Sequence, residues 1–231
     1  MDRAFNRREL LALAGTAGAS ALLRGIPGFA QDKPACVVRP QQMEGPYFVE
    51  TGLNRSDIRS DPATGTVKPG MPLQLTFHVS RVDGSACAPL PNAHIELWQC
   101  DALGVYSGVR DPSGDTTGQK FLRGYQVTDA AGVTHFTTIY PGWYPGRTVH
   151  LHFTIRVGRP TNRRDEFTSQ LYFDDTLSDR VFALAPYASR GQRSVRNGGD
   201  GIFRRGGSQL LLAVQERGER LAATFDVGMQ T

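Results

Sequence analysis

The sequence predicts an all-β protein, a single-domain antiparallel β-sandwich with long loops and an N-terminal arm. Four stretches alternate between apolar and polar residues with a period of two, which is typical of half-buried strands. The 231 residues include 26 Gly and 14 Pro, a content that favours many turns. Beyond the first thirty residues the sequence contains no long amphipathic pattern and no internal repeat, so we expect neither a helical bundle nor a repeat protein.

The expected strands follow one another along the chain with turn signals between them. They are Leu73–Val79, Ala93–Trp98, Val133–Ile139 and Val149–Val157. Dipeptides such as Asp83-Gly84 separate them. Near the end, Leu210–Gln215 and Leu221–Val227 flank Arg217-Gly218-Glu219, which predicts a β-hairpin. The segments 31–70 and 186–209 are rich in Pro, Gly, Ser and Arg, and we expect them to wrap the sandwich as arms.

The N-terminus has the layout of a twin-arginine export signal. Arg7-Arg8 precede a small, apolar run from Leu10 to Leu23, which ends near Gly28-Phe29-Ala30. A transmembrane helix needs about 20 apolar residues, so this run predicts no stable membrane anchor. A disordered basic tail would explain the arginines but not the apolar run. We therefore expect residues 1–30 to be a signal peptide, residues 31–231 to form the folded domain, and the protein to be periplasmic or secreted.

The charge of the chain gives no indication of a nucleic-acid partner. The formal net charge is +4, and removal of residues 1–30, with four basic and two acidic residues, lowers it to +2. No stripe of Lys and Arg with interleaved aromatic residues is present.

Three cysteines remain after the expected processing, and they lack the CxxC spacing of zinc sites. An oxidising compartment permits a disulfide. Sequence alone cannot pair the cysteines. We expect Cys36 to pair with Cys87, because both lie in turn-like segments with proline nearby, and Cys100 to be a buried thiol at the end of a strand.

Two histidines occupy one face of the strand Val149–Val157. Its odd-numbered positions are all apolar, so alternation places these on one side and His150 and His152 together on the other. Two imidazoles two residues apart can share a metal ion or lie side by side in solvent. The HxH pattern by itself is a weak signal.

The loop before this strand favours a metal site. Residues 140–147, Tyr-Pro-Gly-Trp-Tyr-Pro-Gly-Arg, form a Gly/Pro-rich segment that carries aromatic hydroxyls and a guanidinium to the start of the strand. Residues 153–160 contain no carboxylate, which both a cupin and a 2-His-1-carboxylate Fe(II) site would need. Phenolate is a hard anionic ligand, so tyrosines beside two histidines point to Fe(III) rather than zinc.

Four motifs, in order over about 110 residues, resemble the intradiol ring-cleavage dioxygenases, specifically the protocatechuate 3,4-dioxygenase-like branch with exported members. They are Glu44-Gly45-Pro46-Tyr47, Arg55-Ser56-Asp57-Ile58, the run from Trp98 to Ser107, and the run from Thr138 to Phe153. Each motif alone is modest, but together they are specific. The resemblance weakens after Phe173.

The resemblance implies a β-sandwich enzyme that uses Fe(III) and O2 to open a catechol-type ring between its two hydroxylated carbons, giving a muconate-type diacid. The implied iron ligands are Tyr106, Tyr144, His150 and His152. Tyr144 would also take a proton from the substrate. Arg147 would stabilise negative charge on the ring, and Gln170 would help to orient the substrate. The partners are then a small catechol-type aromatic and O2.

Other readings stay open at the level of sequence. The chain could be a non-catalytic exported β-sandwich binding module, or a copper or zinc enzyme that uses His150 and His152. The sequence does not identify the catechol, and it leaves homo-oligomer formation open. Tyr47 and Tyr140 are expected to be packing or substrate-pocket aromatics, and Trp98 a core residue.

Overall fold

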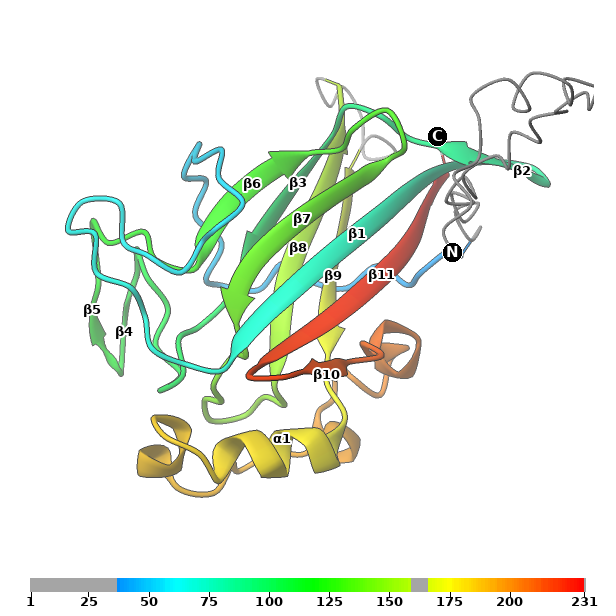
Figure 1. Cartoon of the computed structure of the whole chain (residues 1–231). Coiled ribbons are helices and arrows are strands. Elements are labelled where there is room, and N and C mark those ends of the chain that lie inside the picture. Colours follow the sequence, from blue (N-terminus) through cyan, green and yellow to red (C-terminus); the bar gives the residue numbers. More distant parts are fainter. Residues whose placement is uncertain (1–36, 159–165, 231) are drawn as a thin grey trace, which may run out of the picture. The chain divides into compact units, whose positions relative to one another are not determined.

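Two β-sheets face each other in the computed structural model, which describes residues 37–158 and 166–230 (Figure 1). The first sheet has the order β10, β11, β1, β2, and β7 also pairs with β1. Its strands are β1 (Pro72–Asp83), β2 (Ala86–Pro89), β7 (Val133–Ile139), β10 (Gln215–Arg217) and β11 (Arg220–Gln230). The second has the order β6, β3, β8, β9, from β3 (Ala93–Trp98), β6 (Arg123–Val127), β8 (His150–Val157) and β9 (Glu166–Tyr172). A short hairpin, β4 (Arg110–Asp111) with β5 (Gly114–Asp115), lies apart from both sheets.

The core between the sheets is built on aromatic side chains. Phe77 of β1 lies 6.1 Å from Phe136 of β7 and 6.0 Å from Phe225 of β11, measured between ring centroids. Phe153 of β8 crosses from the other sheet, 5.3 Å from Phe77 and 5.6 Å from Phe225. All four rings are at most 2% exposed. Such pairs stabilise a core beyond the area that they bury, so they fix the position of β8 against the first sheet.

Strand β8 is buried on both faces. Leu151, Phe153 and Ile155 point into the core between the sheets, as the alternation predicts, and are fully buried. His150 and His152 take the opposite face, and they too are only 2% and 1% exposed. This face is therefore covered, which excludes the interpretation that the two imidazoles lie side by side in solvent.

The helical elements are short. Helix α1 (Asp175–Phe182) begins after Asp174, whose side chain accepts hydrogen bonds from the amides of Thr176 and Leu177. Three 3-10 turns follow, at Tyr187–Arg190, Asn197–Gly199 and Gly207–Leu210. In the part of the chain that the structure describes, no helix reaches the length and apolar character needed to span a bilayer.

The predicted all-β sandwich is confirmed, with two differences of detail. Strand β1 pairs in parallel with β11, whereas an antiparallel sandwich was expected. A parallel pair needs a long connection, and most of the chain lies between these two strands. The hairpin β10–β11 forms as predicted, but its first strand begins only at Gln215. Leu210 and Leu212 before it are buried by packing, and the amide of Leu212 bonds to Tyr172 O of β9.

The two cysteines within the described residues have the states that we expected, a buried thiol and a disulfide. Cys100 is a free, buried thiol, and Cys87 is disulfide-bonded. Cys36 lies outside the described residues, so its pairing with Cys87 stays a prediction. The predicted signal peptide, residues 1–30, also lies outside them, and export by the twin-arginine route stays a prediction.

Candidate metal and substrate site

His150 is held as a neutral imidazole with a free lone pair on Nε2. Its Nδ1 lies 2.6 Å from Thr148 O, and because a carbonyl only accepts, Nδ1 carries the proton. Nε2 then faces two other predicted ligands, Tyr144 Oη at 3.0 Å and His152 Nε2 at 3.0 Å. Burial, and then the nearby Arg147 charge, lower the pKa of His150 to about 3. An imidazole fixed in this way by a backbone carbonyl has the arrangement commonly seen in metal-binding histidines.

His152 is enclosed by the second sheet and by the N-terminal arm, residues 37–47. Its ring stacks on Trp98, the opposite residue on β3, at 5.1 Å and an interplanar angle of 9°. On the arm, a Cβ at Gly45 would lie 3.2 Å from His152 Cε1, and the φ of Gly45 is +79°. Burial lowers the pKa of His152 well below its usual value, and His150 lowers it further. Both imidazoles are therefore neutral at physiological pH.

Tyr106 reaches the cluster from the loop after β3. Asp101 closes the turn before it, because its Oδ1 accepts hydrogen bonds from the amides of Leu103 and Val105. The Tyr106 ring stacks on Tyr47 of the arm at 4.4 Å. Its hydroxyl is buried and has no hydrogen-bond partner among the described residues, although the Tyr144 ring lies 5.6 Å away. A buried hydroxyl without a partner is costly, and this oxygen has the position and the chemistry of a metal ligand.

Tyr144 is presented by the Gly/Pro-rich loop, which packs against the Tyr106 loop. A Cβ at Gly142 would lie 2.5 Å from the carbonyl oxygens of both Asp101 and Ala102, so only glycine permits this approach. The amide of Gly142 also donates to Asp101 O at 3.0 Å. The two loops that carry the predicted tyrosine ligands are thus joined to each other next to the histidines of β8.

Arg147 lies at the edge of the cluster, and three different groups contact its three nitrogens. Nε donates to Asp200 Oδ2 at 2.8 Å, and Nη2 donates to Gln170 Oε1 at 2.5 Å. Nη1 lies 3.4 Å from His150 Nε2. Burial would lower the pKa of the guanidinium, but Tyr144 and Asp200 outweigh this effect, and the pKa is raised. A permanent positive charge therefore lies beside the predicted ligands.

Gln170 is brought to the same face by strand pairing. It is the residue opposite His152 in the β8–β9 register and is fully buried. Its Nε2 donates to Met43 O of the arm at 2.9 Å, and its Oε1 lies 3.0 Å from Tyr172 Oη, whose single proton has a closer acceptor in Gln42 Oε1 at 2.6 Å. Gln170, which only the family resemblance indicated, thus lies inside the cluster and is hydrogen-bonded to Arg147.

Two buried residues of the cluster, Asp200 and Tyr172, were not predicted from the sequence. Asp200 forms an ion pair with Arg147 from a segment expected only to wrap the sandwich, and Tyr172 lies against Gln170. The alternation of Glu166–Tyr172 was the available signal for Gln170 and Tyr172, whereas nothing near Asp200 in the sequence indicated a contact with Arg147.

The donor set fits a ferric ion. Two neutral imidazoles meet the buried phenol of Tyr106 and the partly buried phenol of Tyr144 here, and the Tyr106 hydroxyl is without a hydrogen-bond partner among the described residues. Phenolate oxygen and imidazole nitrogen together suit Fe(III). No group of three or more His, Cys, Asp or Glu side chains within the described ranges is placed to hold a metal ion.

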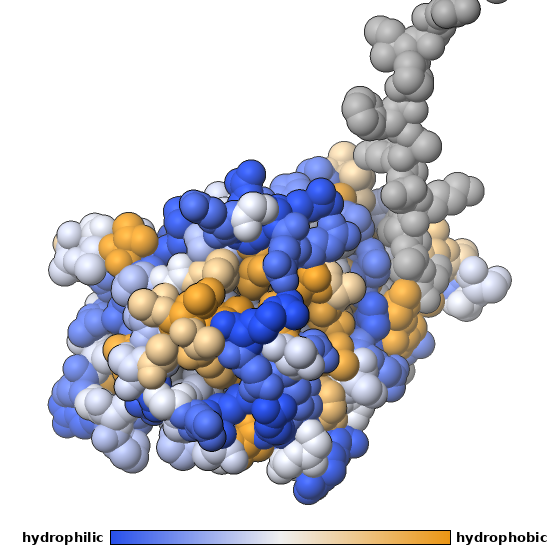
Figure 2. Space-filling model, turned by 60° about the horizontal axis from the view of Figure 1, so that its bottom comes forward, coloured by the Kyte–Doolittle hydropathy of each residue, from blue (hydrophilic) through white to orange (hydrophobic). Residues whose placement is uncertain are grey.

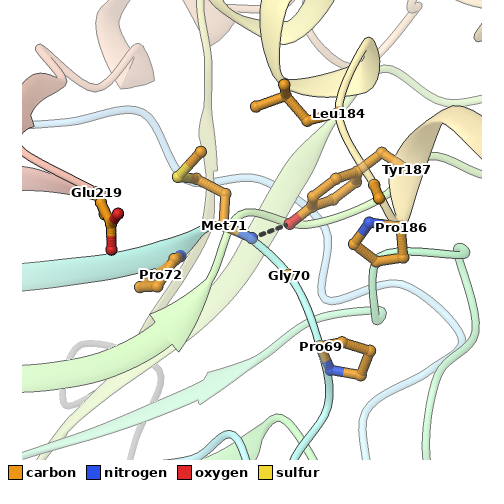
Figure 3. A pocket seen from close by; sticks show the side chains of 9 residues that line it. Pro69, Gly70, Met71, Pro72, Leu184, Pro186, Tyr187 and Glu219 are labelled. Carbon is orange, nitrogen blue, oxygen red and sulfur yellow. Dashed lines mark hydrogen bonds between the residues drawn. The ribbon is translucent and has the colours of Figure 1, made fainter.

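A separate apolar pocket of about 430 Å³ lies near helix α1 and the β10–β11 turn. Figure 2 shows that apolar surface on this side of the sandwich lies in patches among polar residues. Leu184 and Pro186 line the pocket opposite Met71, and Tyr187 Oη accepts a hydrogen bond from the Met71 amide at 2.9 Å (Figure 3). None of the six predicted site residues lines it.

Fold and cluster together define a β-sandwich protein with a buried set of tyrosine and histidine donors. Comparison with known proteins agrees with this class. The family model described as "Dioxygenase" matches residues 43–197. The chain is 31% identical to the protocatechuate 3,4-dioxygenase beta chain of Burkholderia cepacia, over 72% of this chain and 69% of that protein. It is 34% identical to the catechol 1,2-dioxygenase of Acinetobacter baylyi, over 54% of this chain but only 39% of that protein.

Solved structures show the same relationship. An intradiol ring-cleavage dioxygenase from Tetranychus urticae superposes with a TM-score of 0.72 at 30% identity, covering 84% of this chain and 95% of that one. The dioxygenase domain of a carbohydrate-binding fusion protein from Streptomyces sp. SirexAA-E gives a TM-score of 0.59 at 32% identity, over 84% of this chain and 99% of that one. The chain belongs to the intradiol ring-cleavage dioxygenase family.

Proposed function

We propose that the protein is a non-haem Fe(III) dioxygenase that inserts both atoms of O2 into a catechol-type aromatic. The ring opens between the two hydroxylated carbons and gives a muconate-type diacid, so that all atoms of both reactants are retained in the product. The observation that carries the proposal is the convergence of four donors in one buried cluster of a chain that belongs to this family. These donors are Tyr106, Tyr144, His150 and His152.

These four side chains would hold the ferric ion. Bound there, the ion would act as a Lewis acid toward the two oxygens of a catechol. The protein supplies the rigid part of the site through β8, whose inner face is locked into the aromatic core by Phe153. Tyr106 and Tyr144 come from loops, so these two side chains can move more freely than His150 and His152 on β8.

Arg147 and Gln170 would act on the substrate. The guanidinium nitrogen Nη1 faces the donors, whereas Nε and Nη2 are engaged by Asp200 and Gln170. A fixed cation at this edge stabilises negative charge that develops on the ring, and it needs no reorganisation to do so. Gln170 keeps this cation in place through its hydrogen bond with Nη2, and it lies on the same side of the site.

Tyr144 Oη would receive a substrate proton. Burial raises the pKa of this phenol above its usual value, and the nearby Arg147 opposes the shift. A phenolate at this position is therefore a strong base unless another cation stabilises it. Tyr144 lies on the loop before β8, so its side chain can move without disturbing the packing between the sheets.

The proposed activity is tested by oxygen uptake with the iron-loaded protein against catechol, protocatechuate, hydroxyquinol and a chlorocatechol. We expect uptake of one O2 per catechol and a product heavier by two oxygen atoms. Removal of iron should abolish uptake, and zinc should not restore it. If the protein stays colourless after it is supplied with iron, and binds catechols without consuming O2, the alternative of a non-catalytic binding module is correct.

Tyr144→Phe should retain iron, because Tyr106, His150 and His152 remain. Its visible absorption should change, since one tyrosinate is lost, and the catechol complex should form more slowly, since the proton acceptor is lost. Stopped-flow spectroscopy measures that rate. Tyr47→Phe, which removes a hydroxyl from a ring that stacks on Tyr106, is the matched control. Formation of the complex at the wild-type rate in Tyr144→Phe would exclude this residue as the base.

A further inference from the structure

Asp200 is a buried carboxylate outside the four motifs of the sequence. It is 1% exposed and follows the 3-10 turn Asn197–Gly199. Its partner Arg147 lies 53 residues earlier in the chain, and the Arg147 side chain is itself only 16% exposed. A buried charge pair needs close geometry and further hydrogen bonds to offset its desolvation, and this pair has both.

The two oxygens of Asp200 have different tasks. Oδ1 accepts hydrogen bonds from the amides of Ile202 at 2.6 Å and Phe203 at 3.1 Å, and so closes the turn that follows. Oδ2 accepts from Arg147 Nε at 2.8 Å and from the amide of Thr148 at 2.9 Å. Burial would raise the pKa of this carboxyl, but the hydrogen bonds from Thr148 and Arg147 outweigh it and the pKa is lowered. Asp200 is therefore anionic and saturated with donors.

The guanidinium of Arg147 is planar, so two fixed nitrogens determine the direction of the third. Asp200 fixes Nε, and Gln170 fixes Nη2. Nη1 then has a single direction, toward His150 Nε2 at 3.4 Å. Without the bond at Nε, the side chain can turn about the remaining bond to Gln170, and Nη1 loses this direction.

We propose that Asp200 is a positioning residue, which aims Nη1 of Arg147 at the ring of the bound substrate. The proposal rests on the proposed function, because it assigns the effect of Asp200 on turnover to the position of Arg147. Asp200 makes no hydrogen bond to any of the four predicted ligands, and it reaches the site through Arg147 and the Thr148 backbone.

Asp200→Ser separates the two tasks of the carboxylate. A serine hydroxyl can still accept from the amides of the following turn, but it cannot also reach Arg147. Asp200→Asn is the second variant, in case one of the two does not fold. In both, we expect kcat to fall by about 10- to 100-fold, as for a misplaced catalytic group, with iron content unchanged. In an Arg147→Ala background the same substitution should change kcat by less than about twofold, since coupled residues are not additive.

If the substitution at Asp200 lowered kcat by the same factor in the wild-type and the Arg147→Ala backgrounds, Asp200 would not act through Arg147. If kcat were unchanged in the single variants, Asp200 would have no positioning role. Asp61→Asn is the matched control, because Asp61 is a buried carboxylate that accepts from the amides of Ala63 and Lys120 instead. We expect it to keep the wild-type kcat.

A crystal structure of the metal-free Asp200→Ser protein gives a readout that does not depend on activity. We expect Arg147 Nη1 to lie well away from His150 Nε2, compared with 3.4 Å in the unmodified chain. An unmoved guanidinium would overturn the positioning role. If the wild-type protein oxidised no catechol but Arg147 moved in the variant, the proposed function would fail while the structural role of Asp200 stood.

Discussion

Replacing His152 with alanine should abolish stoichiometric iron binding and nearly all turnover. His152 Nε2 lies 3.0 Å from His150 Nε2, and its ring is clamped between Trp98 and the backbone of Gly45. No other imidazole among the described residues can replace it, because His78, His94 and His135 are engaged elsewhere, with Asp226, Tyr125 and Thr76. Iron per chain by elemental analysis and oxygen uptake with catechol measure the two effects.

The control for this variant is His135→Ala. His135 lies on β7, is exposed, and contacts Thr76 Oγ1 at 2.9 Å. We expect it to keep both iron and activity. Thermal unfolding of both metal-free variants separates loss of a ligand from loss of the fold. Full iron occupancy with normal turnover in His152→Ala would show that the ligand assignment is wrong, and with it the proposed metal site.

Arg147→Ala should retain iron and lose turnover by about 10² to 10³, which corresponds to about 2.7–4 kcal/mol of transition-state stabilisation. The guanidinium contacts Gln170 and approaches His150, but nitrogen atoms that carry a positive charge do not bind metal ions. Its contribution is therefore electrostatic and acts on the substrate. Steady-state kinetics with the iron content of each preparation test this expectation.

Arg156→Ala is a closely matched control. Both arginine side chains are about equally buried, 16% exposed for Arg147 and 15% for Arg156, and both are ion-paired. Arg147 lies just before the start of β8, whereas Arg156 lies near the end of this strand and pairs with Glu96 and Glu166. Its removal should lower stability and leave turnover per iron unchanged. Equal turnover in the two variants would return Arg147 to a purely structural role.

The sequence predicted those parts of the site that depend on local periodicity. Alternation along β8 placed His150 and His152 on one face and Phe153 on the other, because strand geometry alone decides this. Whether that face is buried could not be predicted from the strand. It is covered by Met43 and Gly45 of the arm, which lie more than one hundred residues earlier in the chain.

Contacts between distant segments account for what the sequence did not predict. Gln170 is opposite His152 only because β9 pairs with β8 in one register, and a shift by one residue would have turned its side chain to the other face. Asp200 meets Arg147 through a loop whose composition indicated no structure. The parallel pairing of β1 with β11 likewise brings together two strands that lie far apart in the sequence.

The N-terminal arm makes one wall of the site, and apart from the Tyr47 ring it does so with its backbone. Met43 O accepts a hydrogen bond from Gln170, Gly45 faces His152 so closely that a Cβ would lie 3.2 Å from its ring, and Tyr47 O accepts a hydrogen bond from Arg123. The arm has little ladder pairing to hold it, so the sheets lose no strand if it is removed. A protein shortened to begin after residue 47 could thus keep its sandwich and still have its donors open to solvent. For recombinant work, the position of an N-terminal truncation decides whether the centre is enclosed.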